Sequence, residues 1–382
     1  MNSNIDKMSP FIVMEVLERA QELQRQGVDI IHMEVGEPDF DVPKCVKLSI
    51  NEAVNNGKTH YTHSLGDFVL RSKIAGLYKN EYNVDFLPDN VVVTSGSSTA
   101  ILLVLQLLCN PNDEVIIFNP GYSCYKNFIL SVNAIPVEVN LNPDDGFKIN
   151  INDIKAKISE KTRAIFINSP SNPFGTLIDE NTMKQIASLN IPIISDEIYH
   201  GLVYKDIAHS ILEYTDNAFV INGFSKRYAM TGLRLGYLIS PIKFMRKLQI
   251  MQQNLFICAP SISQFAGISA IENSQSDVDY MKKLYNERRV YLINRLRDLG
   301  FKILVEPQAA FYIFVDARMY ASDTYKFAFD ILENAHVGVT PGIDFGSQGQ
   351  GFLRFSYANS LENIVEATNR IEKYLKSKSL LK

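Results

Sequence analysis

A lysine and an arginine follow an apolar run in the stretch Val220–Tyr237, VINGFSKRYAMTGLRLGY. A lysine that is desolvated and faces a second cation has a lowered pKa, and its neutral amine can attack a carbonyl carbon to form a Schiff base. Lys226 and Arg234 could form such a pair. Taken alone, however, Lys226 is more commonly a surface side chain with a solvated ammonium group. The stretch indicates a reactive lysine only if other functional groups gather beside it.

Hydroxyl side chains follow a second apolar run, NVVVT, in the segment Ser95–Thr99. Backbone N–H groups and two or three hydroxyls at the start of a helix form an anion site, most naturally for a phosphate. The candidates for that site are Ser97 and Ser98. An ordinary helix N-cap is the commoner interpretation of this motif by itself.

Polar side chains also end two further apolar runs. Asp196 and Tyr199 follow IPIIS, and Asn172 follows RAIFINSP. Asp196 is either a surface turn residue, which is the commoner case, or an ionised carboxylate that pairs with a cationic ligand atom. Asn172 with its following proline is ordinary turn chemistry, although its side chain could donate a hydrogen bond to a ligand oxygen.

These four runs belong to a pattern of short apolar segments alternating with longer amphipathic ones, which begins near residue 90. Runs of about five β-branched and apolar residues between helical patterns predict buried parallel strands in an α/β sheet. Ligands of such sheets bind beyond the carboxyl ends of the strands. We therefore expect Lys226, Asp196, Asn172 and the Ser97-Ser98 turn at one edge of the sheet.

The segments outside this pattern predict helices and a smaller second part. Ser9 and Pro10 are expected to be the N-cap and first residue of an opening amphipathic helix. After about residue 242 the helical pattern dominates, and further short apolar runs follow. Helices expected near Thr324 to Asn334 and from Leu361 complete a C-terminal α+β part.

The totals are those of a folded protein that acts on small molecules. Apolar residues make up 46% and charged residues 21% of the 382 residues, close to the average for soluble proteins. The formal net charge is −4 without blocks of like charge, so no nucleic acid or membrane partner is expected. No signal peptide or membrane span is predicted. The four separated cysteines fit reduced thiols in a cytoplasm, which is the expected location, and no metal site is predicted.

One ligand would satisfy all the groups at the predicted sheet edge. It needs a phosphate, a carbonyl, a protonatable ring nitrogen and a ring oxygen, and pyridoxal 5′-phosphate has all four. The convergence of the motifs predicts this cofactor more strongly than any single motif does.

The chain also resembles the fold-type I aminotransferases of the broad class I/II family. The similarity extends from VGEPDF at Val35–Phe40 to GFLRFSYANS at Gly351–Ser360. The ordered motifs that carry it are YTHSLGDFVLR, VTSGSSTA, NPGYSCY, NSPSNPFGT, SDEIYHGLVY, GFSKRYAMTGLRLGY and RFSYANS. The resemblance implies a mostly parallel central sheet with helices on both faces and a smaller α+β domain. The large cofactor-binding domain would be residues 45–282, and residues 1–44 and 283–382 would form the small domain.

The resemblance implies a role for each residue that matches the family's motifs. Lys226 would form the Schiff base with the cofactor and move a proton at the substrate α-carbon, while Asp196 would pair with the pyridine nitrogen. Tyr199 and Asn172 would hydrogen-bond the ring oxygen. Further cofactor contacts would come from Ser97, Ser98, Tyr122, Ser225 and Arg234. For Ser225 a local backbone hydrogen bond is an equal alternative, and for Tyr122 simple packing is the alternative.

The resemblance also implies how substrate and partner are bound. Arg354 would hold the substrate α-carboxylate through two parallel hydrogen bonds, supported by Asn172 and the backbone of Gly36. Tyr61 would reach the cofactor phosphate of a neighbouring subunit, which implies a homodimer with shared sites. The sequence departs from the family's pattern at Phe174, where threonine is frequent. A ring at that position could alter the packing near the cofactor.

The implied activity is that of an aminotransferase. An amino acid and a 2-oxo acid would exchange an amino group in a ping-pong cycle, with the cofactor alternating between pyridoxal and pyridoxamine forms. A carbon–sulfur β-lyase, a decarboxylase or a synthase that uses pyridoxal phosphate is the alternative, because a fold does not determine the reaction. A non-catalytic regulator that binds this cofactor is a third class. The substrate is not identified, and Phe11, Ile12, Met14 and His63 are pocket candidates by position only.

Overall fold

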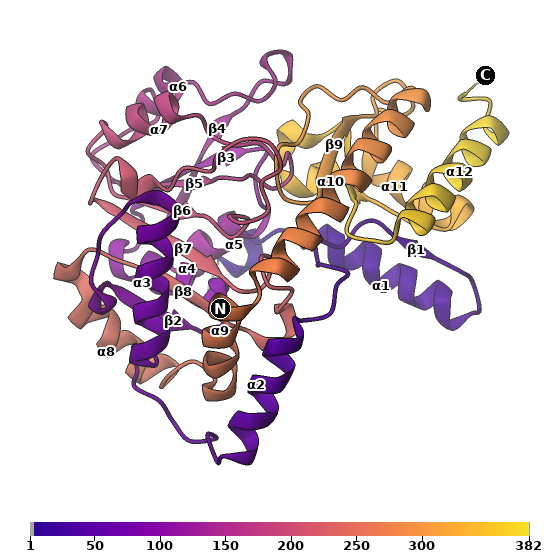
Figure 1. Cartoon of the computed structure of the whole chain (residues 1–382). Coiled ribbons are helices and arrows are strands. Elements are labelled where there is room, and N and C mark those ends of the chain that lie inside the picture. Colours follow the sequence, from indigo (N-terminus) through magenta and orange to yellow (C-terminus); the bar gives the residue numbers. More distant parts are fainter. Residues whose placement is uncertain (1–3, 382) are drawn as a thin grey trace.

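The computed structural model describes residues 4–381 and builds them around a seven-stranded sheet with the strand order β2-β8-β7-β6-β5-β3-β4 (Figure 1). The strands are β2 (Val91–Thr94), β3 (Glu114–Asn119), β4 (Ile135–Asn140), β5 (Thr162–Asn168), β6 (Ile193–Asp196), β7 (Ala218–Gly223) and β8 (Gly236–Ile239). β8 runs antiparallel to both of its neighbours, and the other adjacent pairs are parallel. The predicted mostly parallel sheet is confirmed. β4 and β8 were not predicted, because β4 is a half-exposed edge strand and β8 is short and begins at a glycine.

The strand register aligns the polar residues at the carboxyl edge of this sheet. All side chains of β6 and β7 are buried, which explains their continuous apolar sequences. Asn168 of β5 pairs with Asp196 of β6, and Asp196 pairs with Ile221 of β7. The segments that follow these three strands therefore start side by side at one edge.

Helices cover both faces of the seven-stranded sheet, as the alternation of buried residues along β5 requires. Ile165 and Ile167 point to one apolar cluster, and Ala164 and Phe166 point to another on the opposite face. The first cluster includes residues of α2 (Lys44–Asn55), α3 (Phe68–Tyr82), α6 (Ile151–Lys155), α7 (Glu180–Ala187) and α9 (Ser261–Asn273). The second includes residues of α4 (Ser97–Leu108), α5 (Cys124–Ser131) and α8 (Met245–Leu255).

The C-terminal part has its own antiparallel sheet, with the strand order β11-β12-β9. Its elements are β9 (Tyr312–Asp316), β11 (Thr340–Pro341), β12 (Phe352–Ser356), α10 (Gln275–Asp298), α11 (Thr324–Ala335) and α12 (Leu361–Ser377). The N-terminal strand β1 (Ile31–His32) pairs in parallel with β10 (Val337–Gly338). The helices expected near Thr324 and from Leu361 are confirmed.

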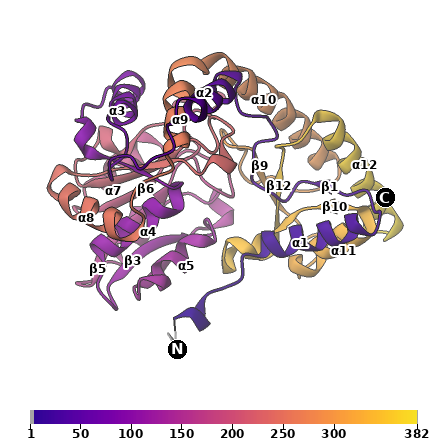
Figure 2. The same cartoon turned by 90° about the horizontal axis from the view of Figure 1, so that it is seen from below.

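The opening helix α1 (Ile12–Arg25) lies beside α11 and begins later than predicted (Figure 2). Its N-cap position is Phe11, which makes no side-chain capping bond, so the predicted start at Ser9 and Pro10 is wrong. The Asp344 carboxylate, from a 3-10 turn before β12, accepts a hydrogen bond from the first helical N–H at 2.7 Å. A cap that comes from a distant part of the chain leaves no local signal in the sequence.

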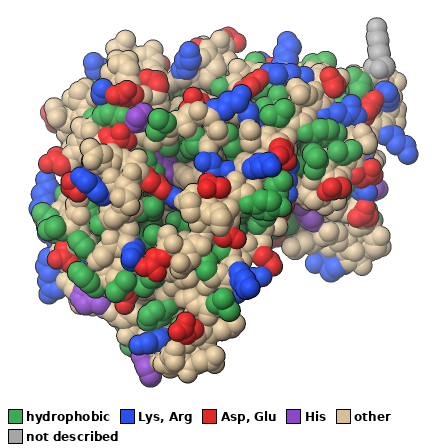
Figure 3. Space-filling model, viewed as in Figure 1, with side chains coloured by type: hydrophobic (Ala, Val, Ile, Leu, Met, Phe, Trp, Pro, Cys, Tyr) green, Lys and Arg blue, Asp and Glu red, His purple; other side chains and the backbone are tan. Residues whose placement is uncertain are grey.

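The surface seen in Figure 3 carries basic and acidic side chains interspersed with one another. Across residues 4–381, no helix is both long enough and apolar enough to cross a membrane.

Candidate active site

A cavity of about 320 Å³ lies where β5, β6 and β7 end. All of the residues singled out in the sequence for the site line it except Tyr61: Gly36, Ser97, Ser98, Tyr122, Asn172, Asp196, Tyr199, Ser225, Lys226, Arg234 and Arg354. Residues from both sheets and from the N-terminal segment therefore meet in one place. Its volume lies at the lower end of the range for small-molecule sites.

Lys226 follows β7 and extends a half-buried side chain into the cavity. Its Nζ donates a hydrogen bond to the backbone oxygen of Gly36 at 2.6 Å. Burial lowers the pKa of Lys226 to about 8; the Glu37 carboxylate opposes this shift, and Arg354 and Arg234 add to it. A large fraction of the side chain is therefore a neutral amine at mildly alkaline pH, as nucleophilic attack on a carbonyl requires.

Asp196 ends β6 with its side chain almost completely buried. Its Oδ2 accepts a hydrogen bond from the Tyr125 hydroxyl at 2.7 Å, and its Oδ1 accepts one from the backbone N–H of Ile198 at 3.1 Å. Burial raises the pKa of Asp196 to about 6, although both hydrogen bonds and the positive charge of Lys226 favour the ionised form. Within residues 4–381 it forms no ion pair. A cationic ligand atom would therefore stabilise its ionised form.

The start of α4 and Arg234 lie together in the lining of the cavity, where they could bind an anion. Gly96 is the N-cap of α4 with φ +81°, and a Cβ there would lie 2.4 Å from Nη2 of Arg234. Ser97 and Ser98 follow in the first turn. Arg234 donates to the backbone oxygen of Thr231 at 2.9 Å, and no carboxylate in the described part of the chain pairs with it. The helix N-terminus and the guanidinium both favour a bound anion.

Arg354 projects from β12 and is only 3% exposed. Its Nη1 donates to Oδ1 of Asn172 at 2.9 Å, its Nη2 donates to the backbone oxygen of Glu34, and its Nε has no partner among the described residues. The rings of Tyr312 and Phe345 lie 4.3 Å and 4.9 Å from its Cζ. A buried guanidinium with an unused donor and no carboxylate partner in residues 4–381 calls for an anionic ligand.

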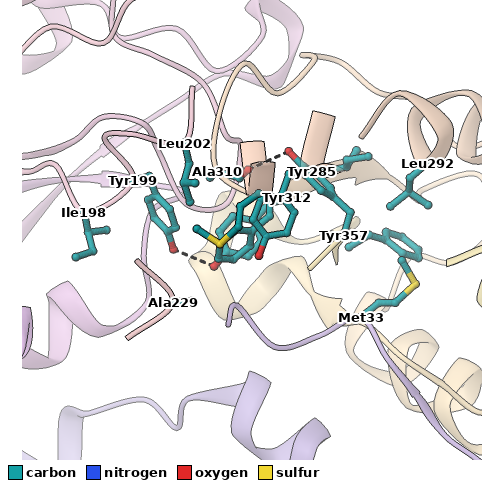
Figure 4. Packing of buried hydrophobic residues seen from close by; sticks show 14 of the residues in the cluster. Met33, Ile198, Tyr199, Leu202, Ala229, Tyr285, Leu292, Ala310, Tyr312 and Tyr357 are labelled. Carbon is teal, nitrogen blue, oxygen red and sulfur yellow. Dashed lines mark hydrogen bonds between the residues drawn. The ribbon is translucent and has the colours of Figure 1, made fainter. Parts of the chain in front are cut away.

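Two tyrosines that the sequence patterns did not predict, Tyr125 and Tyr312, help to build the site. The hydroxyl of Tyr312 lies 2.9 Å from that of Tyr199 (Figure 4), and burial raises the pKa of Tyr199 well above its ordinary value. Tyr125 holds the carboxylate of Asp196. Tyr125 lies in the first turn of α5, three residues after Tyr122, and this spacing could have indicated that it reaches the same site. No local signal indicates Tyr312, because β9 is distant in the sequence from Tyr199 and from the other residues of the site.

The residues that were pocket candidates by position divide into two groups. Phe11 and Met14 line the cavity, and the ring of Phe11 packs edge-on against Tyr122 with centroids 6.0 Å apart. The side chains of Ile12 and His63 do not line it. One wall of the cavity is therefore made by the first turn of α1.

Tyr61 and Phe174 lie outside this cavity. The side chain of Tyr61 is 84% exposed. The segment that carries it is attached to α9 three residues earlier, where the backbone oxygen of Lys58 accepts a hydrogen bond from the Ser261 hydroxyl. The ring of Phe174 stacks on Phe147 with centroids 4.5 Å apart and packs edge-on against Phe314. The Phe174 side chain, which stands where the family often has threonine, therefore belongs to an aromatic cluster between the two sheets and does not fill the cavity.

Comparisons with known proteins agree along nearly the whole chain. The family model for aminotransferase class I and II matches residues 28–371. A (5-formylfuran-3-yl)methyl phosphate transaminase from Methanocaldococcus jannaschii is 43% identical over 370 residues, which are 96% of each chain. An aspartate aminotransferase from Pyrococcus horikoshii is 37% identical over 95% of this chain and 94% of its own. The chain therefore belongs to the class I and II aminotransferase family.

Solved structures support the same assignment. Aspartate aminotransferase from Thermus thermophilus with maleate has a TM-score of 0.93 and 32% identity, and the match covers 98% of this chain and 99% of that one. A Methanococcus jannaschii protein described as similar in its active site to kynurenine aminotransferases has a TM-score of 0.91 and 41% identity, over 98% and 100%. The expected fold type I architecture is confirmed. The protein is an aminotransferase, and these relatives do not support the lyase alternative.

The lowered pKa of Lys226 predicts unusual reactivity in the cofactor-free protein. Labelling of Lys226 by trinitrobenzenesulfonate should rise with pH through a midpoint near 8, because only the neutral amine reacts. The measurement is peptide mapping of the labelled protein across pH 6 to 11, with surface lysines in the same digest as reference. A midpoint above about 10, the value for an exposed lysine, would contradict the desolvated environment described for Nζ.

Proposed function

We propose that this aminotransferase binds pyridoxal 5′-phosphate in the cavity and that Lys226 is its Schiff-base and proton-transfer residue. The observation that carries the proposal is a set of ionisable groups that face one cavity without ion-pair partners in residues 4–381. Four of these groups are Asp196, Lys226, Arg234 and Arg354, and a fifth, Glu37, is hydrogen-bonded to the Thr231 hydroxyl. The first four would face, in that order, a protonated ring nitrogen, a carbonyl carbon, a phosphate and a substrate anion.

The residues present fit this cofactor. Glycines leave room at the proposed phosphate site, because a Cβ at Gly236 would lie 2.6 Å from the backbone nitrogen of Ser97. Arg234 with Ser97 and Ser98 would hold the phosphate, and the nearly buried Ser225 lies in the same wall. The remaining cofactor contacts would come from Tyr122 against the ring face, Asp196 at the ring nitrogen, and Tyr199 and Asn172 at the ring oxygen.

When bound, pyridoxal phosphate supplies an electron sink for the negative charge that develops at the substrate α-carbon. Lys226 would take the proton from that carbon and return it during the second half of the cycle. A pKa near 8 suits this task, because the amine is partly neutral at working pH and still basic enough to hold a proton. Tyr199, whose pKa is raised, remains a hydrogen-bond donor throughout.

The charges of the cavity restrict the substrate to one anionic group. Among residues 4–381, three cationic side chains line the cavity, and two of them, Lys226 and Arg234, would serve the cofactor. Arg354, whose Nε has no partner among the described residues, is then left to bind a single substrate anion. A dicarboxylate such as aspartate would need a second cation from a neighbouring subunit.

The substrate side of the cavity is apolar. Its wall is formed by Phe11, Val13, Met14 and Val35. We therefore propose an amino acid donor and an acceptor with an apolar or aromatic body, a carbonyl and one anionic group. The substrate named for the M. jannaschii relative, a furan aldehyde with one phosphate, has this composition, and an aromatic 2-oxo acid has it too.

In a homodimer, Tyr61 of one subunit could reach the cofactor site of the other. Tyr61 is 84% exposed, and exposed apolar side chains occur nearby in the sequence and in the adjoining helix end, namely Phe68, Val69, Leu255 and Ile257. The segment of Tyr61 is joined to α8 through a contact of His63 with Gln249. Such a surface suits contact with a second copy of the chain, whose cofactor phosphate Tyr61 would then reach.

The division of the chain and its location are further parts of the proposal. Pairing of β1 with β10 and packing of α1 against α11 support a small domain made of residues 1–44 and 283–382, with residues 45–282 as the large one. The four cysteines form no disulfide, which suits a role in cytoplasmic amino acid metabolism.

Gly96→Ala should weaken cofactor binding about 10-fold or more while the fold remains intact. A side chain at φ +81° is strained and would displace the Arg234 guanidinium from the start of α4. The measurement is an absorbance titration of cofactor-free protein with pyridoxal phosphate. Gly232→Ala is the matched control, because a Cβ there meets no atom within 4 Å. Equal affinities for the two variants would contradict the proposed phosphate site.

The proposed reaction is tested by single half-reactions. Cofactor-loaded protein mixed with an amino acid alone should yield one equivalent of the pyridoxamine form and of the oxo product, without ammonia. The aromatic 2-oxo acid phenylpyruvate or (5-formylfuran-3-yl)methyl phosphate should then restore the pyridoxal form faster than 2-oxoglutarate does. Arg354→Lys should lower kcat/KM roughly 100-fold, because lysine cannot form the paired hydrogen bonds. A preference for 2-oxoglutarate would refute the proposed substrate class, and sustained ammonia release would refute transamination.

A shared active site predicts complementation between two inactive variants. Lys226→Ala and Tyr61→Ala should each be severely impaired as pure proteins. After mixing and subunit exchange, about a quarter of the sites would combine an intact Lys226 with an intact Tyr61 from the other chain, and activity should recover to about that level. Light scattering checks the dimer. Mixed protein that stays at the level of its components would show that Tyr61 does not act across subunits.

A further inference from the structure

The segment Asn4–Phe11, here called the strap, connects α1 to α5. From α1, which packs with the C-terminal part, it runs toward α5 on the seven-stranded sheet (Figure 2). Asn127 of α5 binds its backbone twice, since Oδ1 accepts from the N–H of Ser9 at 3.2 Å and Nδ2 donates to its C=O at 3.0 Å. Asn4 donates to Oδ1 of Asn133 at 3.1 Å. The strap therefore bridges the two parts of the molecule.

The second end of the strap is held by Asp344. Its Oδ1 accepts the hydrogen bond from the first N–H of α1 at 2.7 Å, where Phe11 offers no cap of its own. The Asp344 side chain is 6% exposed, and its Oδ2 has no hydrogen-bond partner among the described residues. The next residue, Phe345, packs on the guanidinium of Arg354. One short turn thus contacts both the strap and the proposed anion-binding arginine.

The strap ends at the wall that would contact the body of the substrate. Phe11 and Met14 line the cavity, and Phe11 packs edge-on against Tyr122. The position of these two side chains depends on the first turn of α1, and so on its cap. The cofactor groups at the strand ends are held by other contacts, such as those between Asp196 and Tyr125.

The rest of α1 is anchored independently of the strap. Val16, Ala20 and Leu23 are buried against Leu332 of α11, and Arg19 forms an ion pair with Glu333. Loss of a contact to the strap should therefore release residues 4–11 and the first turn of α1 without unfolding the helix.

We propose that Asn127 and Asp344 are positioning residues for substrate specificity: they fix the strap so that Phe11 and Met14 pack on an apolar substrate body. This inference rests on the proposed function of the cavity and adds a way to select among substrates that share one anionic group. A substrate without an apolar body would not bind more tightly when the strap is in place, because it offers no surface for Phe11 and Met14 to pack on.

The kinetic test compares a large and a small substrate in the cofactor-loaded protein. Asn127→Ala and Asp344→Ala should each raise KM for phenylalanine about 5- to 30-fold, the size of effect expected for a lost cap, and leave KM for alanine within about 2-fold. Asp344→Asn should raise KM for phenylalanine much less than Asp344→Ala does, because the amide oxygen still accepts the hydrogen bond from the first N–H of α1. The variant also lacks the negative charge that acts on Arg354, so a small change common to phenylalanine and alanine is expected from that charge. The control is Asn334→Ala, an exposed asparagine bonded only within its own helix.

A second readout does not depend on activity. The bond after the exposed Lys7 lies within the strap, and its cleavage by trypsin, followed by mass spectrometry, reports strap release. Cleavage should be at least about 5-fold faster in Asn127→Ala and Asp344→Ala than in Asn334→Ala. The thermal midpoint should stay the same within experimental error.

Two results would overturn the inference: an equal rise in KM for phenylalanine and alanine, or cleavage after Lys7 that is no faster in the two variants than in the control. Either would assign Asn127 and Asp344 a general structural role. Failure of the proposed function looks different. In that case the unchanged protein would give no half-reaction with either amino acid, whereas the cleavage experiment would still report on the strap.

Discussion

The hydrogen bond between Arg354 and Asn172 joins the two sheets at the point where the site is built. Arg354 belongs to β12, and Asn172 follows β5 of the seven-stranded sheet. A buried guanidinium loses its hydration, so the bond offsets that free-energy cost only if both partners are held in place. Stacking on Tyr312 and Phe345 and the backbone oxygen of Glu34 hold it from the C-terminal side. The geometry of the cavity thus depends on how the two sheets dock.

The same region carries charges that the fold itself does not neutralise. Asp196 and Arg354 are both nearly buried, and neither has an ion-pair partner in residues 4–381. Such groups oppose folding, and the extensive apolar clusters on both faces of the sheet offset that cost. A ligand that supplies the missing charges would stabilise the folded chain by mass action. Binding of the proposed cofactor would therefore offset the cost of burying these charges.

The sequence predicts the parts of the site that are local and fails for those that are not. Asp196 ends a strand, and Lys226 and Ser97 each come three residues after one, so the rule that ligands bind at the carboxyl ends of parallel strands places them together. Tyr312 contributes to the same site from β9, and no spacing relates it to Tyr199. The start of α1 was misplaced for the same reason, since its cap is Asp344. Residues that depend on tertiary contacts become visible only in the folded structure.

This contrast also separates two layers of function. The groups that face the proposed cofactor come from strand ends of one rigid sheet, so their relative positions are set by backbone register. The residues proposed to face the substrate body come from the strap and the first turn of α1, and these are held by a few side-chain hydrogen bonds. Relatives that share this fold are named for aspartate, aromatic and furan phosphate substrates. In this chain a rigid centre at the strand ends is thus combined with a separately fastened wall, and such a wall can be altered without moving the strand ends.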